Sequence, residues 1–413
     1  MNTTLDTRDT VCVVRQPILD DTGRVFAYEL LYREDLTVEV EAGSADLTRA
    51  RVLTDAVLSL GLDTLTDGLP AFLSLTRELL MLDAGTLLPP ASVVLELPKD
   101  LVADDEVVAA CRRLFGLGYQ LALTGLGSST DLDRLFPFVK FWKIDAATVS
   151  PHTRKSLPVQ CASRSVQVIA ERVETFEAAR ELQGLGYRFF QGYYFCKPDT
   201  VGTGALPTRR LAYLNLLAAL NKPDVSLSEV ENLVKHDLTL SYRVLRSINS
   251  AAFGLRREVS SIRQALVLLG LGQIQKWASV WSMAGLNSGG TSETVSMAII
   301  RARCCELLGI KVAGEEGGAE YFLLGLCSLL DSMLRRPMSD ALAEVPVSDM
   351  IKDALLGEPN LARLVLDAVV AYERGEWELA ADVANQAFID PKLLPLAYSD
   401  ALVWARELSK AAA

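Results

Sequence analysis

Acidic and basic residues recur near the ends of strand-like segments in the first half of this sequence. They are Glu29, Arg33, Glu96, Lys143 and Glu171. Carboxylates can bind hard cations or carry protons, and a neighbouring lysine or arginine can hold an anion or pair with the acids. For a single strand, a buried ion pair in an ordinary α/β sheet is the preferred interpretation. Because the pattern repeats over several strands, a shared site is favoured for the whole set.

The segment from Phe26 to Arg33 alternates between two kinds of side chain. One face carries Phe26, Tyr32 and the large residues between them, and the other face carries Glu29 and Arg33. In a closed barrel the bulky face would pack outward under helices, and the polar face would point inward near the mouth. The corresponding positions late in the other strands are Ser74, Glu96, Thr124, Lys143, Glu171 and Gln191.

Strand and helix patterns alternate from Val11 to about Pro198, which predicts a modified TIM-like (β/α) barrel. The second strand follows the first too closely for a crossover helix, and Gly23 supplies a hairpin turn. One strand should therefore run antiparallel. The expected strands are Cys12–Ile18, Val25–Tyr32, Ala71–Thr76, Ser92–Leu97, Leu121–Leu126, Val139–Ile144, Gln167–Ala170 and Phe189–Phe195, with helices such as Leu47–Leu60, Glu106–Phe115 and Phe176–Leu185 between them.

Helical periodicity replaces this alternation after Pro207, which predicts an all-α second domain. Ser226 and Glu229 form a capping-box pattern, and Gly270, Gly309 and Gly357 are expected to end helices. The predicted organisation is a disordered N-terminus (1–10), a barrel (11–198), a linker (199–206) and a helical domain (207–410).

Composition narrows the class of protein. The formal net charge of −11 argues against a general nucleic-acid binder, which would show a basic face. The two histidines, His152 and His236, are too few for a histidine-rich metal site or a histidine-based triad. The seven cysteines are scattered, as is typical of reduced thiols in the cytoplasm. No signal peptide or membrane span is expected, and the predicted location is cytoplasmic.

Six short motifs occur in order in the first half: Gln16-Pro17-Ile18, Tyr28-Glu29-Leu30-Leu31-Tyr32-Arg33, Glu96-Leu97-Pro98, Lys143-Ile144-Asp145, Ala170-Glu171-Arg172-Val173-Glu174-Thr175 and Gln191-Gly192-Tyr193. This stretch resembles the EAL domain family, cyclic di-GMP phosphodiesterases built on a modified barrel with one antiparallel strand. In that family three glutamates, an asparagine and an Asp-Asp pair hold two metal ions. The resemblance places Glu29, Glu96 and Glu171 at metal-ligand positions, and it matches Lys143 and Gln191 to residues that assist the attacking water and the site.

The resemblance is incomplete where the metal ions would be bridged. Ser74 stands at the asparagine position, and Thr124-Gly125 replace the Asp-Asp pair. Lys99 and Arg172 add positive charge nearby. Two adjacent divalent ions need bridging carboxylates to offset their repulsion, and a hydroxyl and a bare backbone supply none. We therefore expect no efficient phosphodiester hydrolysis and no cofactor, with the three glutamates as vestigial ligands and Lys143 and Glu171 as vestigial catalytic residues.

Ligand binding is a separate question from hydrolysis. By the same resemblance, Arg33 matches an arginine that meets a nucleotide phosphate, and Gln16 lies in the segment near a guanine. The candidate ligand-binding residues are Gln16, Glu29, Arg33, Lys143 and Gln191. A cation at the barrel mouth can hold a phosphate without any metal, so a cyclic di-GMP sensor and a pure scaffold both remain open.

The second half resembles the HDOD family, a relative of HD-type phosphohydrolases that lacks their metal ligands. The resemblance lies in residues 236–254, 262–270 and 325–331. Ser328-Leu329 stand where active relatives carry a histidine–aspartate pair. His236-Asp237 are expected to form a turn between two helices and not a metal site.

The stretches 371–377 and 397–405 resemble those of bacterial EAL–HDOD tandem proteins. This implies a signalling protein that acts through protein partners, with cyclic di-GMP as a candidate ligand and no nucleic acid. The rival hypothesis is a residual phosphodiesterase that uses Glu29, Glu96 and Glu171 around a single Mg²⁺ or Mn²⁺ with Lys143. A third hypothesis, nucleic-acid binding through the helical domain, is disfavoured by the acidity.

Overall fold

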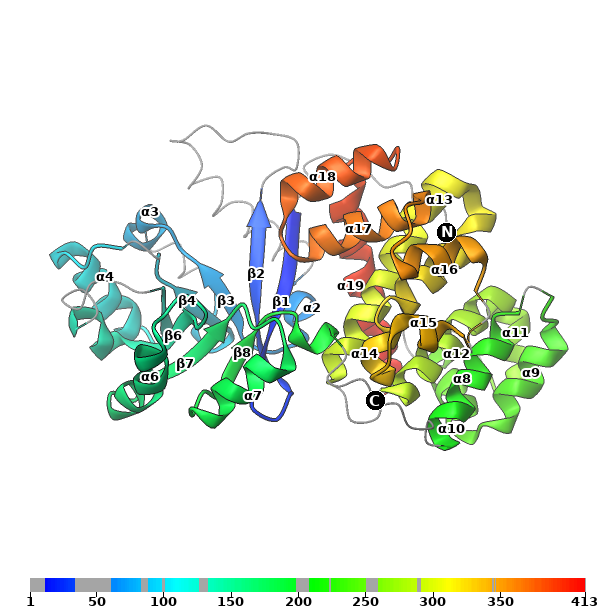
Figure 1. Cartoon of the computed structure of the whole chain (residues 1–413), viewed down its shortest axis with the longest axis horizontal. Coiled ribbons are helices and arrows are strands. Elements are labelled where there is room, and N and C mark those ends of the chain that lie inside the picture. Colours follow the sequence, from blue (N-terminus) through cyan, green and yellow to red (C-terminus); the bar gives the residue numbers. More distant parts are fainter. Residues whose placement is uncertain are drawn as a thin grey trace. The chain divides into compact units, whose positions relative to one another are not determined.

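The protein forms two compact units. The barrel unit comprises Met1–Lys197 and Ala371–Glu378, and the helical unit comprises Pro198–Val370 and Leu379–Ala413. The computed structural model (Figure 1) describes residues 12–33, 61–82, 88–98, 101–125, 133–197, 208–222, 224–249, 259–287, 291–343, 345 and 347–412. The expected N-terminal segment, the Leu47–Leu60 helix, Lys99 and the 199–206 linker lie outside these residues.

Eight strands close into a barrel in sequence order. The strand β1 runs antiparallel to both of its neighbours, β2 and β8, whereas the other neighbouring strands are parallel. This confirms the predicted barrel with one antiparallel strand. The strands are β1 (Cys12–Asp20), β2 (Val25–Arg33), β3 (Ala71–Ser74), β4 (Val93–Glu96), β5 (Gln120–Thr124), β6 (Val139–Asp145), β7 (Gln167–Glu171) and β8 (Phe189–Gln191).

The turn between β1 and β2 shows why these two strands are antiparallel. Gly23 has a φ of 79°, which glycine adopts without steric cost. The side chain of Asp20 accepts hydrogen bonds from the backbone nitrogens of Thr22 and Arg24, at 2.9 and 3.0 Å. The hairpin brings Gln16 opposite Glu29 in the ladder, so both side chains reach the same part of the barrel.

An apolar layer fills the barrel interior. It consists of Ile18, Ala27, Phe72, Val94, Ala122, Phe141 and Ile169, with Phe26 and Phe189 packed against it. In each strand from β2 to β8, the residue two positions after this layer is polar. Because side chains repeat their direction every second residue, a polar layer follows the apolar one toward the carboxyl ends of these strands.

Phe26 departs from the expected outward direction. Its ring lies 5.7 Å from Phe141 and 4.5 Å from Phe189, centroid to centroid, within the interior. The ladder pairs Ile18 with Ala27 and Leu19 with Val25, so Phe26 is an extra residue at a bulge. Strict alternation fails here because the bulge turns two consecutive side chains, Phe26 and Ala27, toward the core.

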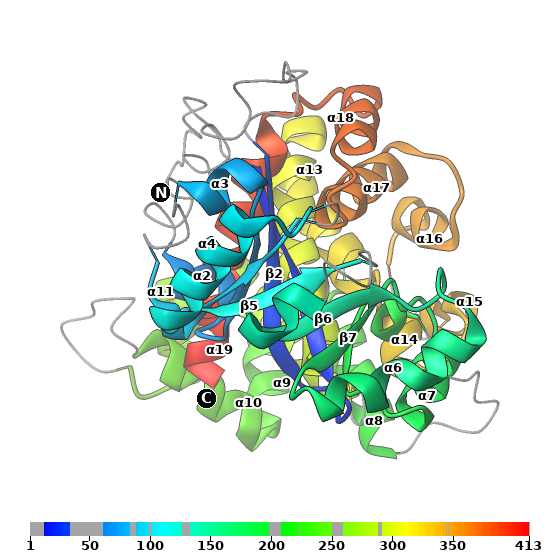
Figure 2. The ribbon, with the colours of Figure 1, turned by 90° about the vertical axis from the view of Figure 1, so that its left-hand side faces the viewer.

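Helices flank the outside of the strands, as Figure 2 shows for α3, α4, α6 and α7. Thr76, Asp104, Ser150 and Thr175 cap the starts of these four helices by accepting backbone hydrogen bonds. The helices of the barrel unit are α2 (Leu62–Thr66), α3 (Arg77–Met81), α4 (Asp105–Gly116), α6 (Pro151–Ser163) and α7 (Phe176–Gly184), with short 3₁₀ turns at Pro90–Ser92, Phe136–Phe138 and Tyr194–Cys196.

The helical unit carries only helices in its described residues, as predicted. They are α8 (Thr208–Leu220), α9 (Leu227–His236), α10 (Leu238–Ile248), α11 (Ile262–Leu269), α12 (Leu271–Leu286), α13 (Ser292–Cys327), α14 (Leu330–Leu334), α15 (Met338–Leu342) and α16 (Asp349–Leu356), with most of α17 (Leu361–Glu373) and α18 (Trp377–Gln386), and with α19 (Leu393–Ala412). The capping box of Ser226 and Glu229 is present at the start of α9.

The prediction that Gly309 ends a helix is wrong. Helix α13 continues through it to Cys327, with a kink at Gly314, where φ is 75°. A β-carbon on Gly309 would lie 2.3 Å from the Tyr321 ring, so glycine is needed there for close packing. Gly270 and Gly357 do stand at the ends of α11 and α16, as predicted.

His236 and Asp237 form the helix junction that the sequence predicts. His236 is the last residue of α9, and Asp237 Oδ1 accepts a hydrogen bond of 3.0 Å from the backbone nitrogen of Leu240. The Nδ1 atom of His236 lies 2.7 Å from the carbonyl oxygen of Asn232. Both side chains therefore serve local capping.

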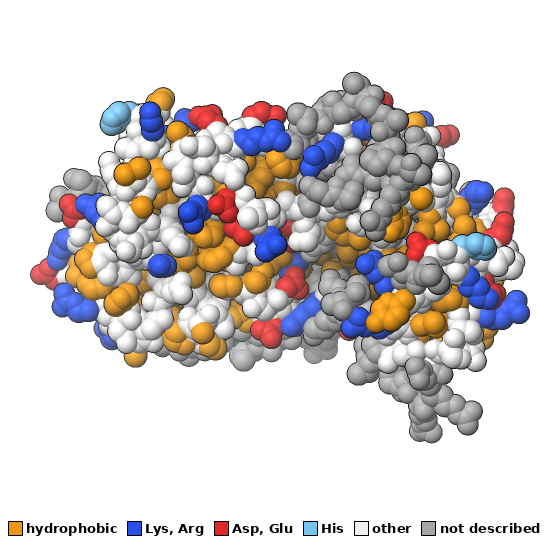
Figure 3. All heavy atoms as spheres, turned by 90° about the horizontal axis from the view of Figure 1, so that it is seen from below, with side chains coloured by type: hydrophobic (Ala, Val, Ile, Leu, Met, Phe, Trp, Pro, Cys, Tyr) orange, Lys and Arg blue, Asp and Glu red, His pale blue; other side chains and the backbone are white. Residues whose placement is uncertain are grey.

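None of the described helices is both long and apolar enough to span a bilayer. Six of the seven cysteines are buried. On the face drawn in Figure 3, side chains of both charges are interspersed with hydrophobic ones.

Candidate functional site

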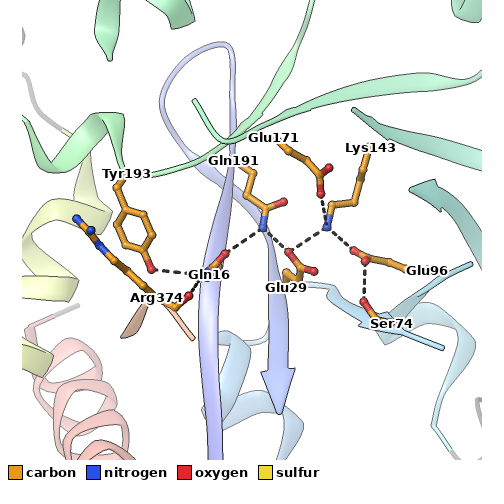
Figure 4. A network of polar contacts seen from close by, with 9 residues as sticks. All are labelled: Gln16, Glu29, Ser74, Glu96, Lys143, Glu171, Gln191, Tyr193 and Arg374. Atoms are coloured by element: carbon orange, nitrogen blue, oxygen red, sulfur yellow. Dashed lines mark hydrogen bonds and ion pairs between the residues drawn. The ribbon is translucent and has the colours of Figure 1, made fainter. Parts of the chain in front are cut away.

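The amine of Lys143 lies at the centre of the polar layer in the barrel. Its Nζ atom is 2.9 Å from Glu29 Oε2, 2.8 Å from Glu96 Oε1 and 3.3 Å from Glu171 Oε1 (Figure 4). The lysine is 0% exposed, and Glu96 is 2% exposed. Strands β2, β4, β6 and β7 each contribute one of these four residues, which confirms the convergence expected from the repeated pattern.

Neutral side chains extend this network on both sides. Ser74 Oγ donates a hydrogen bond of 3.0 Å to Glu96 Oε2. The amide of Gln191 donates to Glu29 and, at 3.3 Å, to Gln16 Oε1. Both oxygens of Glu96 therefore have partners, and the network links β1, β2 and β8 to β3, β4 and β6.

A cavity of about 420 Å³ opens beside the network. Its lining includes Gln16, Glu29, Glu171, Gln191, Tyr193 and Arg374. Arg172 also lines it, with a φ of 55° and a distance of 3.6 Å to a carboxyl oxygen of Asp145. Arg33 differs from the expectation: it is not part of the lining, and its guanidinium pairs with Glu378 instead.

Families of known proteins match both halves of this chain. The EAL domain family matches residues 58–198, and the HDOD domain family matches residues 206–333. The chain is 31% identical over 409 residues to the uncharacterized protein YuxH of Bacillus subtilis (strain 168), an alignment that covers 97% of this chain and 99% of YuxH. The chain belongs to the EAL–HDOD family.

A second relative of this EAL–HDOD protein carries an activity in its name. It is the cyclic di-GMP phosphodiesterase CdgJ of Vibrio cholerae serotype O1, 28% identical over 379 residues, with 90% of this chain and 87% of CdgJ covered. Solved structures are more distant. Bacillus subtilis YkuI, with an EAL domain and in complex with cyclic di-GMP and calcium, is 21% identical over 63% of this chain and 71% of its own, with a TM-score of 0.39. Similarity at this level indicates nothing about the ligands of this chain.

The metal pair that the EAL family implies does not fit the residues present. Thr124 supplies a hydroxyl, whose oxygen is buried and has no hydrogen-bond partner in the described part of the chain. Gly125 has no side chain, and its backbone nitrogen donates to the carbonyl of Lys143 at 2.9 Å. Among the residues with described positions, no group of three or more histidine, cysteine, aspartate and glutamate side chains could hold a metal ion. The amine of Lys143 instead offsets the charge of the carboxylates.

Burial and the charges of neighbouring groups shift the pKa values of Glu29, Glu96 and Lys143 in opposing directions. Burial and the neighbouring charge of Glu29 raise the pKa of Glu96 to about 7, despite Lys143. Burial would also raise the pKa of Glu29, but the charge of Lys143 and the hydrogen bond from Gln191 outweigh it and lower the pKa. Burial would lower the pKa of Lys143, and the three carboxylates raise it above its ordinary value. The lysine is therefore charged, and Glu96 takes up a proton at a higher pH than Glu29 does.

The raised pKa of Glu96 predicts a pH-dependent term in stability. Between its ordinary value and about 7, the folded protein binds a proton that the unfolded chain has lost. This stabilisation is complete below pH 4.5 and is lost as the pH rises through 7. Relative to Glu96→Gln, the wild type should lose up to about 3 kcal/mol of unfolding free energy between pH 4.5 and pH 8, at about 1.4 kcal/mol per pH unit.

Urea titrations at several pH values can measure this difference, with hydrogen exchange of peptides from β4 to β6 as the readout for the barrel. Comparing the two proteins at the same pH cancels the intrinsic pH dependence of exchange. Glu106→Gln, which removes an exposed carboxylate, is the matched control and should run parallel to the wild type. Parallel curves for the wild type and Glu96→Gln would contradict the raised pKa.

Two lining residues, Tyr193 and Arg374, were not among the sequence-predicted ligand-binding residues. Tyr193 stands two residues after Gln191, in the Gln191-Gly192-Tyr193 motif, and this position in the sequence indicates that it lies near the site. Arg374 comes from the C-terminal half of the chain, and no periodicity or motif connects it with a barrel strand. Only the three-dimensional structure brings it to the cavity.

Proposed function

We propose that this EAL–HDOD protein is a non-catalytic signalling protein whose barrel binds cyclic di-GMP and whose helical domain interacts with a protein partner. The observation that carries the proposal is the buried amine of Lys143 among Glu29, Glu96 and Glu171, beside a threonine and a glycine where bridging acids would be needed. Such a site has a compensating charge without a metal pair, which favours binding over hydrolysis.

The cavity supports the binding half of the proposal. Its lining combines amide groups from Gln16 and Gln191, an aromatic ring from Tyr193 and guanidinium groups from Arg172 and Arg374. Amides can pair with a base edge, a ring can stack on a base, and a guanidinium can hold a phosphodiester. These are the groups that a cyclic dinucleotide requires, and none of them depends on a metal ion.

The helical domain supports a role in protein interaction. Ser328, at the position of the lost histidine–aspartate pair, donates a hydrogen bond of 2.8 Å to the carbonyl of Gly325, and Leu329 is buried. The helix α11 exposes Val267 and Leu268, at 74% and 58%. Neighbouring exposed apolar side chains on one helix favour contact with another protein.

A second candidate function is a weak metal-dependent phosphodiesterase. In this alternative, Glu29, Glu96 and Glu171 hold a single Mg²⁺ or Mn²⁺ beside Lys143. The relationship to CdgJ, which is named as a cyclic di-GMP phosphodiesterase, favours it.

Two measurements on the full-length protein distinguish these functions. Calorimetric titration with cyclic di-GMP should give the same affinity in the presence of a chelator and of Mg²⁺ or Mn²⁺. Chromatography of the nucleotide after incubation with either metal should show no linear product above the buffer background. Metal-dependent product that disappears in Glu29→Gln would establish the phosphodiesterase instead, and the absence of binding would leave a scaffold without a nucleotide ligand.

A further inference from the structure

The eight residues Ala371–Glu378 belong to the barrel unit although they lie far from its strands in the sequence. Two backbone carbonyls of this segment are held by side chains of the cavity. Gln16 Nε2 donates to the carbonyl of Arg374 at 3.2 Å (Figure 4). The Tyr193 hydroxyl donates to the carbonyl of Glu373 at 2.8 Å. These contacts fix the backbone of the segment at the cavity.

The next residue, Gly375, explains how the segment fits so closely. Its φ is 72°, and a β-carbon there would lie 2.9 Å from Leu31 Cδ1, which itself lines the cavity. A side chain at this position would meet both backbone strain and a steric conflict. The glycine therefore lets the chain turn directly against the barrel and presents the side chain of Arg374 at the cavity.

The guanidinium of Arg374 is placed where an anion could reach it. It lies 5.2 Å from the centroid of the Tyr193 ring, and the residue is exposed. Within the described residues it makes no ion pair or side-chain hydrogen bond, so its five N–H donors face the cavity and solvent. The guanidinium of Arg33, by contrast, forms an ion pair with Glu378, which belongs to the same segment as Arg374.

The cavity lining is rich in carboxylates, so an anionic ligand needs a cation beside it to bind. Four carboxylates, those of Glu29, Glu171, Glu174 and Glu376, line the cavity, against the two cations Arg172 and Arg374. Arg172 is 3.6 Å from Asp145 and is partly compensated by it. Arg374 is thus the cation with the least internal compensation among the described lining residues.

The side-chain oxygen of Gln191 is a second group at the cavity that a ligand could contact. Gln191 is 6% exposed and lines the cavity, and its Oε1 atom is buried without a hydrogen-bond donor among the described residues. A buried acceptor of this kind is costly unless a donor arrives. The N–H edge of a purine base supplies such donors, which matches the amide of Gln191 to the base and Arg374 to the phosphodiester of one ligand.

We propose that Arg374 binds the phosphodiester of a cyclic purine dinucleotide in the barrel cavity and takes the place of Arg33 in that role. The inference rests on the proposed binding of cyclic di-GMP and assigns it a specificity-determining residue from outside the barrel strands. The segment Ala371–Glu378 has two roles in this proposal. Its Glu378 forms an ion pair with Arg33. Its Arg374, which lies over the Tyr193 ring, supplies the guanidinium that binds the phosphodiester instead.

Calorimetric titration of the full-length protein with cyclic di-GMP tests the inference through three variants. Arg374→Gln should weaken binding by about 10- to 100-fold, because it removes a charge-assisted hydrogen bond while keeping a polar side chain. Arg374→Lys should recover part of the affinity, since it keeps the charge but loses the planar fork. Arg188→Gln removes an exposed arginine of the same unit that does not line the cavity, and it should leave the affinity unchanged.

The outcomes separate this inference from the proposed function. Wild-type affinity in Arg374→Gln would overturn the role of Arg374 and leave cyclic di-GMP binding in place. Equal losses in Arg374→Gln and Arg188→Gln would also overturn it, because they would indicate a general effect of charge. A wild-type protein that does not bind would overturn the proposed function and this inference with it. Matching thermal transitions of the variants and the wild type would exclude misfolding as the cause of a loss.

Discussion

Replacing Lys143 with methionine should destabilise the barrel unit by about 3–5 kcal/mol at pH 8, the cost of leaving buried charges without their partner. Methionine has a similar length and fills the volume, so the effect isolates the amine. Three carboxylates, those of Glu29, Glu96 and Glu171, lie within 3.3 Å of that amine. Without it, each carboxylate repels the others, and Glu96, which is 2% exposed, is almost shielded from solvent.

The loss should shrink as the pH falls. Because Lys143 lowers the pKa values of Glu29 and Glu96, its replacement should raise both of them. The folded form should then bind more protons than the unfolded chain and gain stability toward pH 5. Urea unfolding with hydrogen exchange of barrel peptides measures this. Lys140→Met is the matched control, because Lys140 lies on the same strand with its side chain exposed, and it should change little. Equal effects of the two substitutions at pH 8 would contradict the central position of Lys143.

Restoring two acids should give the barrel a stronger dependence on metal ions than the wild type has. We expect Thr124→Asp with Gly125→Asp to raise the affinity for Mn²⁺ by at least about a hundredfold, because direct carboxylate ligands should contribute more than outer-shell partners, whose loss costs about 10- to 100-fold. The Thr124 hydroxyl oxygen is buried without a partner, so a carboxylate there would point toward Lys143 and the glutamates. Gly125 has a φ of 75°, a region that aspartate tolerates better than most residues.

The double variant should also melt at a lower temperature in chelator and recover with Mn²⁺, since added carboxylates repel those already present until a cation binds them. Calorimetric scans with and without Mn²⁺ measure the shift. Thr124→Asn offers oxygen without charge and should show no such response. If the double variant and Thr124→Asn respond alike to Mn²⁺, the two missing acids do not determine the metal affinity of the barrel.

The alternation of side chains was enough to predict most of the barrel site. Glu29 and Lys143 converge because each lies two residues after an interior apolar residue, and a period of two needs no knowledge of the tertiary structure. The same rule failed at Phe26, where the bulge adds one residue to the ladder. A bulge depends on the pairing between strands, which the order of residues along one strand does not reveal.

Two other differences have separate physical causes. A glycine in a helical pattern can mark either the end of a helix or a place of close packing. Gly309 is of the second kind, because it packs against Tyr321, and the prediction of a helix end there is wrong. Arg33 was expected at the cavity because its side chain follows Glu29 by two strand repeats. An acid from the C-terminal half, Glu378, pairs with it instead. Contacts between residues so distant in sequence are beyond the reach of periodicity.

The barrel unit is interrupted in the chain, and this affects both its study and its synthesis. A fragment that ends at Lys197 would lack Glu373, Arg374 and Glu378, so affinities measured on an excised EAL domain would describe an unfinished pocket. During translation the eight strands leave the ribosome well before residue 371, because domains form as the chain emerges from its N-terminus. The strands can close early, but the pocket reaches its final composition only once residues Ala371–Glu378 have been made.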